Sequence, residues 1–103
     1  MFGNIGEMMK LQKQFKDIQK RIKKAEHDGE SSDGLVKVRM NGEFEMISLT
    51  IDDELVKSGD RKKLEKNVQI AVNSAVQKGK SFAATQMKEL TGGLPIPGLS
   101  DLF

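Results

Sequence analysis

The fold is decided by residues 29–51, which read GESSDGLVKVRMNGEFEMISLTI. Alternating and β-branched residues at 35–40 and 44–51 predict two strands, and the Asn41-Gly42 pair between them is a strong hairpin signal. A Ser-Asp-Gly turn at residues 32–34 indicates a further short strand near residues 29–31. We therefore expect three consecutive strands in a small antiparallel sheet.

The pairing of the two hairpin strands depends on the length of the loop at Asn41-Gly42. A two-residue loop and a three-residue loop differ in register by one residue, which exchanges the faces of the side chains. We favour the three-residue loop, because it pairs Met40 with Phe44 and sets Arg39 opposite Glu45 in a favourable charge pair.

Apolar residues change face along the last strand, from Phe44 and Met46 to Ile47, Leu49 and Ile51. This pattern predicts either a bulge or a sheet covered on both sides, and a second copy of the chain could supply the second cover. A chain of 103 residues with only five aromatic residues also has a limited core of its own. We expect a homodimer, with an interface that includes Val36, Val38, Met40, Phe44, Ile47 and Leu49.

Two long amphipathic helices are expected to flank the sheet. In the first, apolar residues recur at spacings of three and four as in a heptad seam, namely Met8, Leu11, Phe15, Ile18, Ile22 and Ala25. Asp28-Gly29 is expected to end this helix. The second is expected over residues 61–90, capped by Ser58 or Asp60. The fold class is therefore α+β, in the order α-β-β-β-α.

The chain is expected to form one domain over residues 1–91. Residues 92–103 begin with Gly-Gly-Leu-Pro-Ile-Pro-Gly, which cannot continue a helix, so we expect a flexible tail there. The absence of cysteine and of any long apolar stretch favours a cytoplasmic protein with no membrane partner.

No residue pattern typical of catalysis is found, neither a Ser-His-Asp set nor a phosphate-binding loop. The only histidine, His27, is expected at the C-terminal end of the first helix, where it favours the dipole. The run Asp52-Asp53-Glu54 could bind a hard cation, but turn chemistry and the dipole of the next helix explain it more simply. We expect no enzymatic activity, cofactor, metal site or small-molecule substrate.

Charge is uneven along the chain, although the net charge is only +2. Residues 1–27 hold seven basic and three acidic residues, residues 28–60 hold three and nine, and residues 61–103 hold seven and three. Basic ends attract a polyanion and an acidic middle repels one. Ordinary solvated helix faces would give similar counts, so the counts alone leave both interpretations open.

Lysines gather on one face of the first helix, roughly opposite the apolar seam, and include Lys13, Lys16, Lys20 and Lys24. The second helix begins with cations at the end that its dipole disfavours, namely Arg61, Lys62, Lys63 and Lys66. Both sets are candidates for contact with DNA phosphates, while the acids at 52–54 are an alternative partner for the second set. Arginine is scarce and Trp and Tyr are absent, which favours backbone contact over reading of bases.

Together these features resemble the YbaB/EbfC family of bacterial nucleoid-associated proteins, over nearly the whole chain. The most specific parts are Met1-Phe2-Gly3-Asn4, Gly34-Leu35-Val36-Lys37-Val38 before Asn41-Gly42, Ile51-Asp52 with Glu54-Leu55, and the Gly-Leu-Pro of the tail. Asp53 departs from the family, whose members often have proline there, and this difference concerns only a turn.

The resemblance implies a dimer formed through the central region, with long helices that project like the arms of tweezers. It further implies binding to double-stranded DNA, a place in the nucleoid and an influence on gene expression. Sequence preference is not implied, because family members differ. The alternative function is a helical protein-interaction module without direct DNA binding, whose seam docks another protein and whose lysines only provide solubility.

Overall fold

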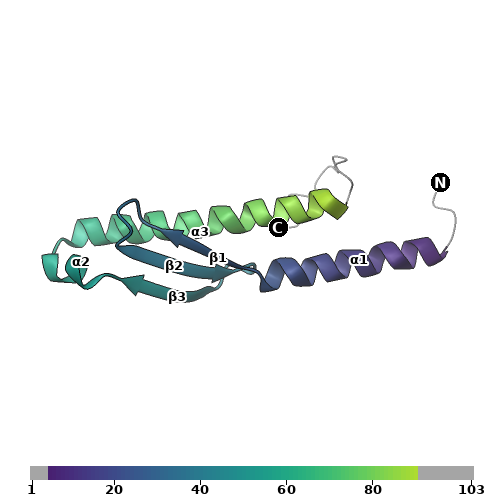
Figure 1. Cartoon of the computed structure of the whole chain (residues 1–103), viewed down its shortest axis with the longest axis horizontal. Coiled ribbons are helices and arrows are strands. Elements are labelled where there is room, and N and C mark those ends of the chain that lie inside the picture. Colours follow the sequence, from purple (N-terminus) through teal and green to yellow (C-terminus); the bar gives the residue numbers. More distant parts are fainter. Residues whose placement is uncertain (1–4, 91–103) are drawn as a thin grey trace.

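The computed structural model describes residues 5–90, so the expected tail at 92–103 lies outside the described residues. The elements are α1 (Ile5–Lys24), β1 (Glu26–Glu30), β2 (Val36–Asn41), β3 (Met46–Ile51), α2 (Asp53–Ser58) and α3 (Arg61–Leu90). Figure 1 shows α3 running along the three-stranded sheet, and α1 leaving the sheet to lie beside the C-terminal part of α3. The molecule is elongated, with extents of 65 × 21 × 16 Å. The α+β class is confirmed.

The first helix ends earlier than the sequence indicated. The prediction that Asp28-Gly29 ends it is wrong, because both residues pair with β2 as part of β1. A side chain at Gly29 would overlap the backbone of Ala71 and Ala75, so this strand approaches α3 through its backbone. His27 is therefore also in β1 and not at a helix end, and its ring lies 5.3 Å from that of Phe82.

The hairpin register also differs from the expected one. Met40 pairs with Met46, not Phe44, and a shift between Arg39 and Met40 marks the irregularity that the change of face predicted. The loop is longer than expected because the Asn41 side chain organises it: its Oδ1 accepts hydrogen bonds from the backbone N–H groups of Glu43 and Glu45. Arg39 consequently pairs with the neighbouring strand β1 and not with Glu45.

The acidic run after β3 begins a short helix, α2, where only a loop before the second long helix was predicted. Asp52 caps it by accepting a hydrogen bond from the N–H of Glu54, and Gly59 ends it in the left-handed conformation with φ of 70°. Asp60 then caps α3, since its Oδ1 accepts from the N–H of Lys63. Asp52 and Asp60 therefore serve as the N-caps of α2 and α3.

Two apolar clusters hold α3 in place. The larger joins the sheet to the N-terminal part of α3 through Val36, Val38, Met40, Leu55, Ala71 and Ala75. The smaller joins α1 to the C-terminal part of α3 through Ile22, Ala83 and Met87, with Phe15 and Ile18 beside them. Small residues recur every four positions along the buried line of α3, so its backbone lies close to the sheet.

Candidate nucleic-acid interface

The lysines of α1 occupy its free side. Lys13, Lys16, Lys20 and Lys24 are all exposed. Ile22, which is 3% exposed, packs on the opposite side of the helix against α3. None of the four lysines forms an ion pair with another residue in the described range 5–90. This α1 lysine face is therefore available to a polyanion.

The first part of α1 carries apolar side chains that nothing in residues 5–90 covers. Ile5, Met8, Met9 and Leu11 are between 46% and 76% exposed. The predicted seam is thus used in two ways. Its second half packs inside the chain, and its first half remains open.

The cations at the start of α3 divide into two kinds. Arg61 lies 3.5 Å from Glu65, and Lys63 lies 3.9 Å from Asp33. Lys62 and Lys66 are exposed and have no ion-pair partner among the described residues. The acids at 52–54, considered above as neutralising partners, do not pair with this cluster in residues 5–90.

Asp33 is the link between the β1–β2 turn and α3. Its carboxylate accepts hydrogen bonds from the Ser31 hydroxyl at 2.7 Å, from the Leu35 N–H and from the Asn67 side chain. These donors, led by Ser31, lower the pKa of Asp33 to about 2. The sequence showed the Ser-Asp-Gly turn, but could not show its partner, because Asn67 lies 34 residues further along the chain.

The two predicted DNA-binding sets do not form one patch. Helix α1, which carries the first set, lies beside and beyond the C-terminal part of α3 (Figure 1). Arg61 to Lys66 belong to the opposite, N-terminal end of α3. Between Lys63 and Met87 the helix rises about 36 Å. Any single DNA contact surface made from both sets must therefore follow the long axis of the molecule.

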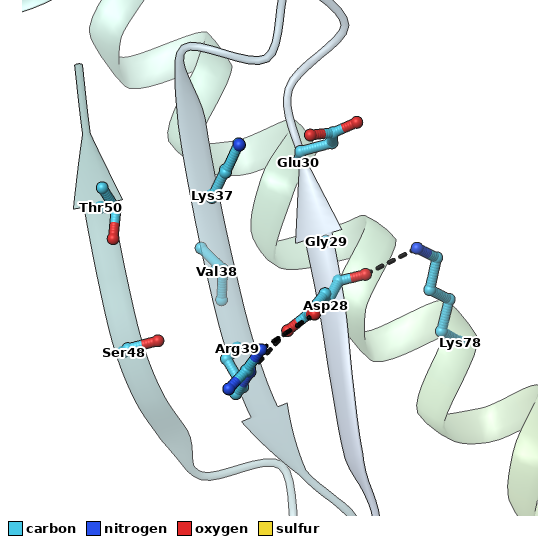
Figure 2. Close-up of a pocket in the computed structure, with 9 residues that line it drawn as sticks. All are labelled: Asp28, Gly29, Glu30, Lys37, Val38, Arg39, Ser48, Thr50 and Lys78. Atoms are coloured by element: carbon cyan, nitrogen blue, oxygen red, sulfur yellow. Dashed lines mark hydrogen bonds and ion pairs between the residues drawn. The ribbon is translucent and has the colours of Figure 1, made fainter.

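The sheet face away from α3 forms an open polar groove of about 430 Å³ (Figure 2). Arg39 donates to both carboxylate oxygens of Asp28, at 2.8 and 3.2 Å, and Lys78 donates to the carbonyl oxygen of Asp28 at 2.7 Å. The Arg39 guanidinium lowers the pKa of Asp28, and Asp28 raises the pKa of Arg39. Since Arg39 and Lys78 already donate to Asp28, this groove is less suited to phosphate than the α1 lysine face.

The sequence of this chain is similar to those of known DNA-binding and nucleoid-associated proteins. The model of the YbaB/EbfC DNA-binding family matches residues 1–94. The chain belongs to this family. A nucleoid-associated protein of Anaeromyxobacter dehalogenans is 41% identical over 91 residues, which cover 88% of each chain. One of Caldanaerobacter subterraneus is 36% identical over 100 residues, covering 93% of this chain and 90% of the other.

The fold has a counterpart among solved structures. The crystal structure of an uncharacterized protein from Helicobacter pylori matches with a TM-score of 0.58. The match covers 84% of this chain and 98% of that one at 24% sequence identity, so it supports the fold alone.

Among residues 5–90, none of the helices has the apolar length that crossing a bilayer requires.

The expected dimer-interface residues of this YbaB/EbfC chain fall into two groups. Val36, Val38 and Met40 are 0–6% exposed, because α3 of the same chain covers them. Phe44, Ile47 and Leu49 are 39–49% exposed, and Met46 beside them is 45% exposed. Only the second group is free to contact another molecule.

Proposed function

We propose that this chain binds double-stranded DNA as a homodimer and acts as a nucleoid-associated protein in the bacterial cytoplasm, with an influence on gene expression. The observation that carries the proposal is the α1 lysine face, defined by Lys13, Lys16, Lys20 and Lys24, which is exposed and lies opposite the side that packs on α3. Membership of a DNA-binding family supports it.

Phosphate contact is the chemistry that these side chains offer. Each lysine is a mobile point charge that neutralises a phosphate and releases a counterion, whichever base is attached. Lys62 and Lys66 add two exposed cations at the start of α3 that have no ion-pair partner in residues 5–90. The binding is therefore proposed to depend strongly on salt.

The homodimer is proposed to form at β3, one of the two edge strands of the sheet. An edge strand offers unpaired backbone N–H and C=O groups, and here its neighbourhood also exposes Phe44, Met46, Ile47 and Leu49. A second copy would pair with this edge and bury these side chains in a symmetric contact. The two α1 helices would then project from a common centre.

The test is fluorescence anisotropy of purified protein with unrelated and randomised duplexes across a salt series. We expect affinity to fall steeply as salt rises, and Lys13→Glu with Lys20→Glu to weaken binding and lower the salt slope by about 2. The charge-matched control is Lys37→Glu with Lys57→Glu, which lie off the α1 lysine face. Failure to bind any duplex at low salt would contradict the proposal.

A protein partner is the second candidate, favoured by the exposed Ile5, Met8, Met9 and Leu11. In this function the open half of the seam docks another helix, and the lysines only keep the chain in solution. Capture experiments from nuclease-treated lysate, with wild-type protein and with Met8→Glu, separate the two functions. Retention of a defined partner that Met8→Glu loses, without any DNA binding, would replace the first proposal.

A further inference from the structure

The face of α3 that points away from the sheet combines lysines with side-chain amides. Between residues 62 and 80, taking about 100° per residue, six exposed residues fall within a sector of roughly 80°, opposite the buried Ala71 and Ala75. They are, in chain order, Lys62, Lys66, Gln69, Asn73, Gln77 and Lys80. We call this set the α3 outer face, and it contains no acidic residue.

The amides of the α3 outer face differ from those that point inward. Asn67 donates to Asp33, and Gln86 accepts from Arg21, so both serve the fold. Gln69, Asn73 and Gln77 form no side-chain hydrogen bond with any other residue in the range 5–90. Their donors and acceptors are therefore open to a ligand.

The position of the three amides along α3 suits entry into a groove. They precede the part of α3 that packs against α1, and this part begins near Phe82. At the three amides, α3 is therefore covered on its inner side by the sheet and not by α1. An α-helix is about 10–12 Å across and the major groove of B-DNA is about 12 Å wide. The helix from Gln69 to Gln77 spans about 12 Å, roughly three base-pair steps.

The lysines lie where the edges of such a groove would be. Lys66 and Lys80 are separated by about 21 Å along the helix, one beyond each end of the amide stretch. Because the major groove winds around the duplex, a straight helix leaves it at both ends, and these lysines then lie near the flanking phosphates. Lys62 adds a further cation at the N-terminal end, where the helix dipole also favours an anion. Amides in the centre with cations outside them match base edges between two phosphate backbones.

We propose that the α3 outer face enters the major groove of duplex DNA and that Gln69, Asn73 and Gln77 contact the base edges. This inference rests on the proposed DNA binding and adds a preference for A·T pairs to it. Amide side chains form two hydrogen bonds with adenine, since they accept from N6 and donate to N7. Lysine cannot form this pair, because its ammonium group only donates. The α1 lysine face then supplies affinity, and the α3 outer face supplies selectivity.

The first experiment selects duplexes with a randomised central segment and compares the affinity for a selected duplex with that for its scrambled version. We expect the wild-type protein to enrich adenine-containing sites. The triple variant Gln69→Ala, Asn73→Ala, Gln77→Ala should lose the preference by roughly tenfold or more, while its affinity for scrambled DNA stays within about twofold. Alanine is the best helix former, so α3 is retained, and circular dichroism verifies this.

The control variant Gln12→Ala with Gln14→Ala removes two exposed amides of α1 and should keep the preference.

A chemical test is independent of folding: 7-deazaadenine in the selected duplex removes the N7 acceptor. It should reduce wild-type affinity and cause no further loss with the triple variant. A wild-type protein that binds but enriches no site, or a triple variant that keeps the preference, would overturn this inference alone. Absence of all DNA binding would overturn the proposed function as well.

Discussion

Gly29 is a residue at which the sheet lies directly against the backbone of α3. A Cβ atom there would overlap the carbonyl oxygen of Ala71 and the backbone nitrogen of Ala75. Backbone lies against backbone at this point, and Ala71 and Ala75 are 0% and 1% exposed. The absence of a side chain at one position therefore sets the distance between two layers of the molecule.

Gly29→Ala is expected to destabilise the protein by about 1–3 kcal/mol, because neither backbone segment can move without disturbing the core around it. Urea denaturation followed by circular dichroism measures the change. Glu30→Ala, at the exposed neighbouring position of the same strand, is the matched control and should leave the midpoint nearly unchanged. Equal midpoints for the two variants would show that β1 can shift away from α3.

Asp33 makes stability depend on pH in the acid range. Its pKa is about 2 in the folded chain, below the ordinary 3.8, because the hydrogen bonds from Ser31, Leu35 and Asn67 favour the carboxylate. A lowered folded pKa contributes stability above about pH 4 and loses it as pH falls towards about 2. Asp33→Asn should therefore unfold at lower urea concentration than wild type at neutral pH, and the difference should shrink between about pH 4 and pH 2.

Asp17→Asn on the exposed side of α1 is the control for this pH dependence. It should follow the wild-type curve throughout the acid range. A difference between Asp33→Asn and wild type that stays constant from neutral pH to about pH 2 would mean that the carboxylate is not the titrating group.

The cations at the start of α3 differ in whether they have an ion-pair partner. Lys63 lies 3.9 Å from Asp33, whereas Lys66 has no partner among the described residues. Lys66→Gln should lower the salt slope of DNA binding by about 1, with a smaller change for Lys63→Gln. Anisotropy titrations of both variants over the same salt series test this. A larger effect at Lys63 would indicate that Asp33 releases it when DNA binds.

The attachment of α1 to α3 depends on a small apolar contact. Ile22 is 3% exposed between Ala83 and Met87. Ile22→Ala should cost about 2–5 kcal/mol locally. Hydrogen exchange should then show faster exchange along α1 and little change in β2. Leu11→Ala is the control, since Leu11 is already 46% exposed. Equal protection of α1 in both variants would contradict the role of Ile22.

Elements with periodic side chains could be predicted from the sequence, and those held by backbone contacts could not. The seam of α1 and the alternating residues of β2 were sufficient for both. β1, which reads Glu-His-Asp-Gly-Glu, has almost no apolar side chains, and only its pairing with β2 and its closeness to α3 make it a strand. The hairpin register failed for a similar reason, because Asn41 folds the loop through its own side chain.

The candidate site shows the same division. Helical spacing was enough to predict that the lysines of α1 share one exposed side. It could not separate Lys63 from Lys66, because Asp33 reaches Lys63 only after the β1–β2 turn packs against α3. It also could not show which amides are used inside the fold, as Asn67 is, and which remain open.

For the whole molecule, the proposed homodimer depends on the edge strand β3. Leu49→Asp places a charge among the exposed apolar side chains beside this edge, and we expect it to produce a monomer. Sedimentation velocity at micromolar concentration measures the mass. Ser48→Asp puts the same charge on the same strand but on the polar groove side, so it should remain dimeric. A monomeric wild-type protein would contradict the dimer directly.

Gly42, at the tip of the hairpin, sits against the last turn of α1. Its N–H donates to the carbonyl oxygen of Lys23, and a side chain there would overlap the backbone of Ile22. This contact fixes the direction of α1 relative to the sheet. A change of one residue in the length of the hairpin turn would redirect α1 and displace its far end. Each lysine would keep its position along the helix. The length of this surface loop therefore sets the direction in which α1 carries its lysines.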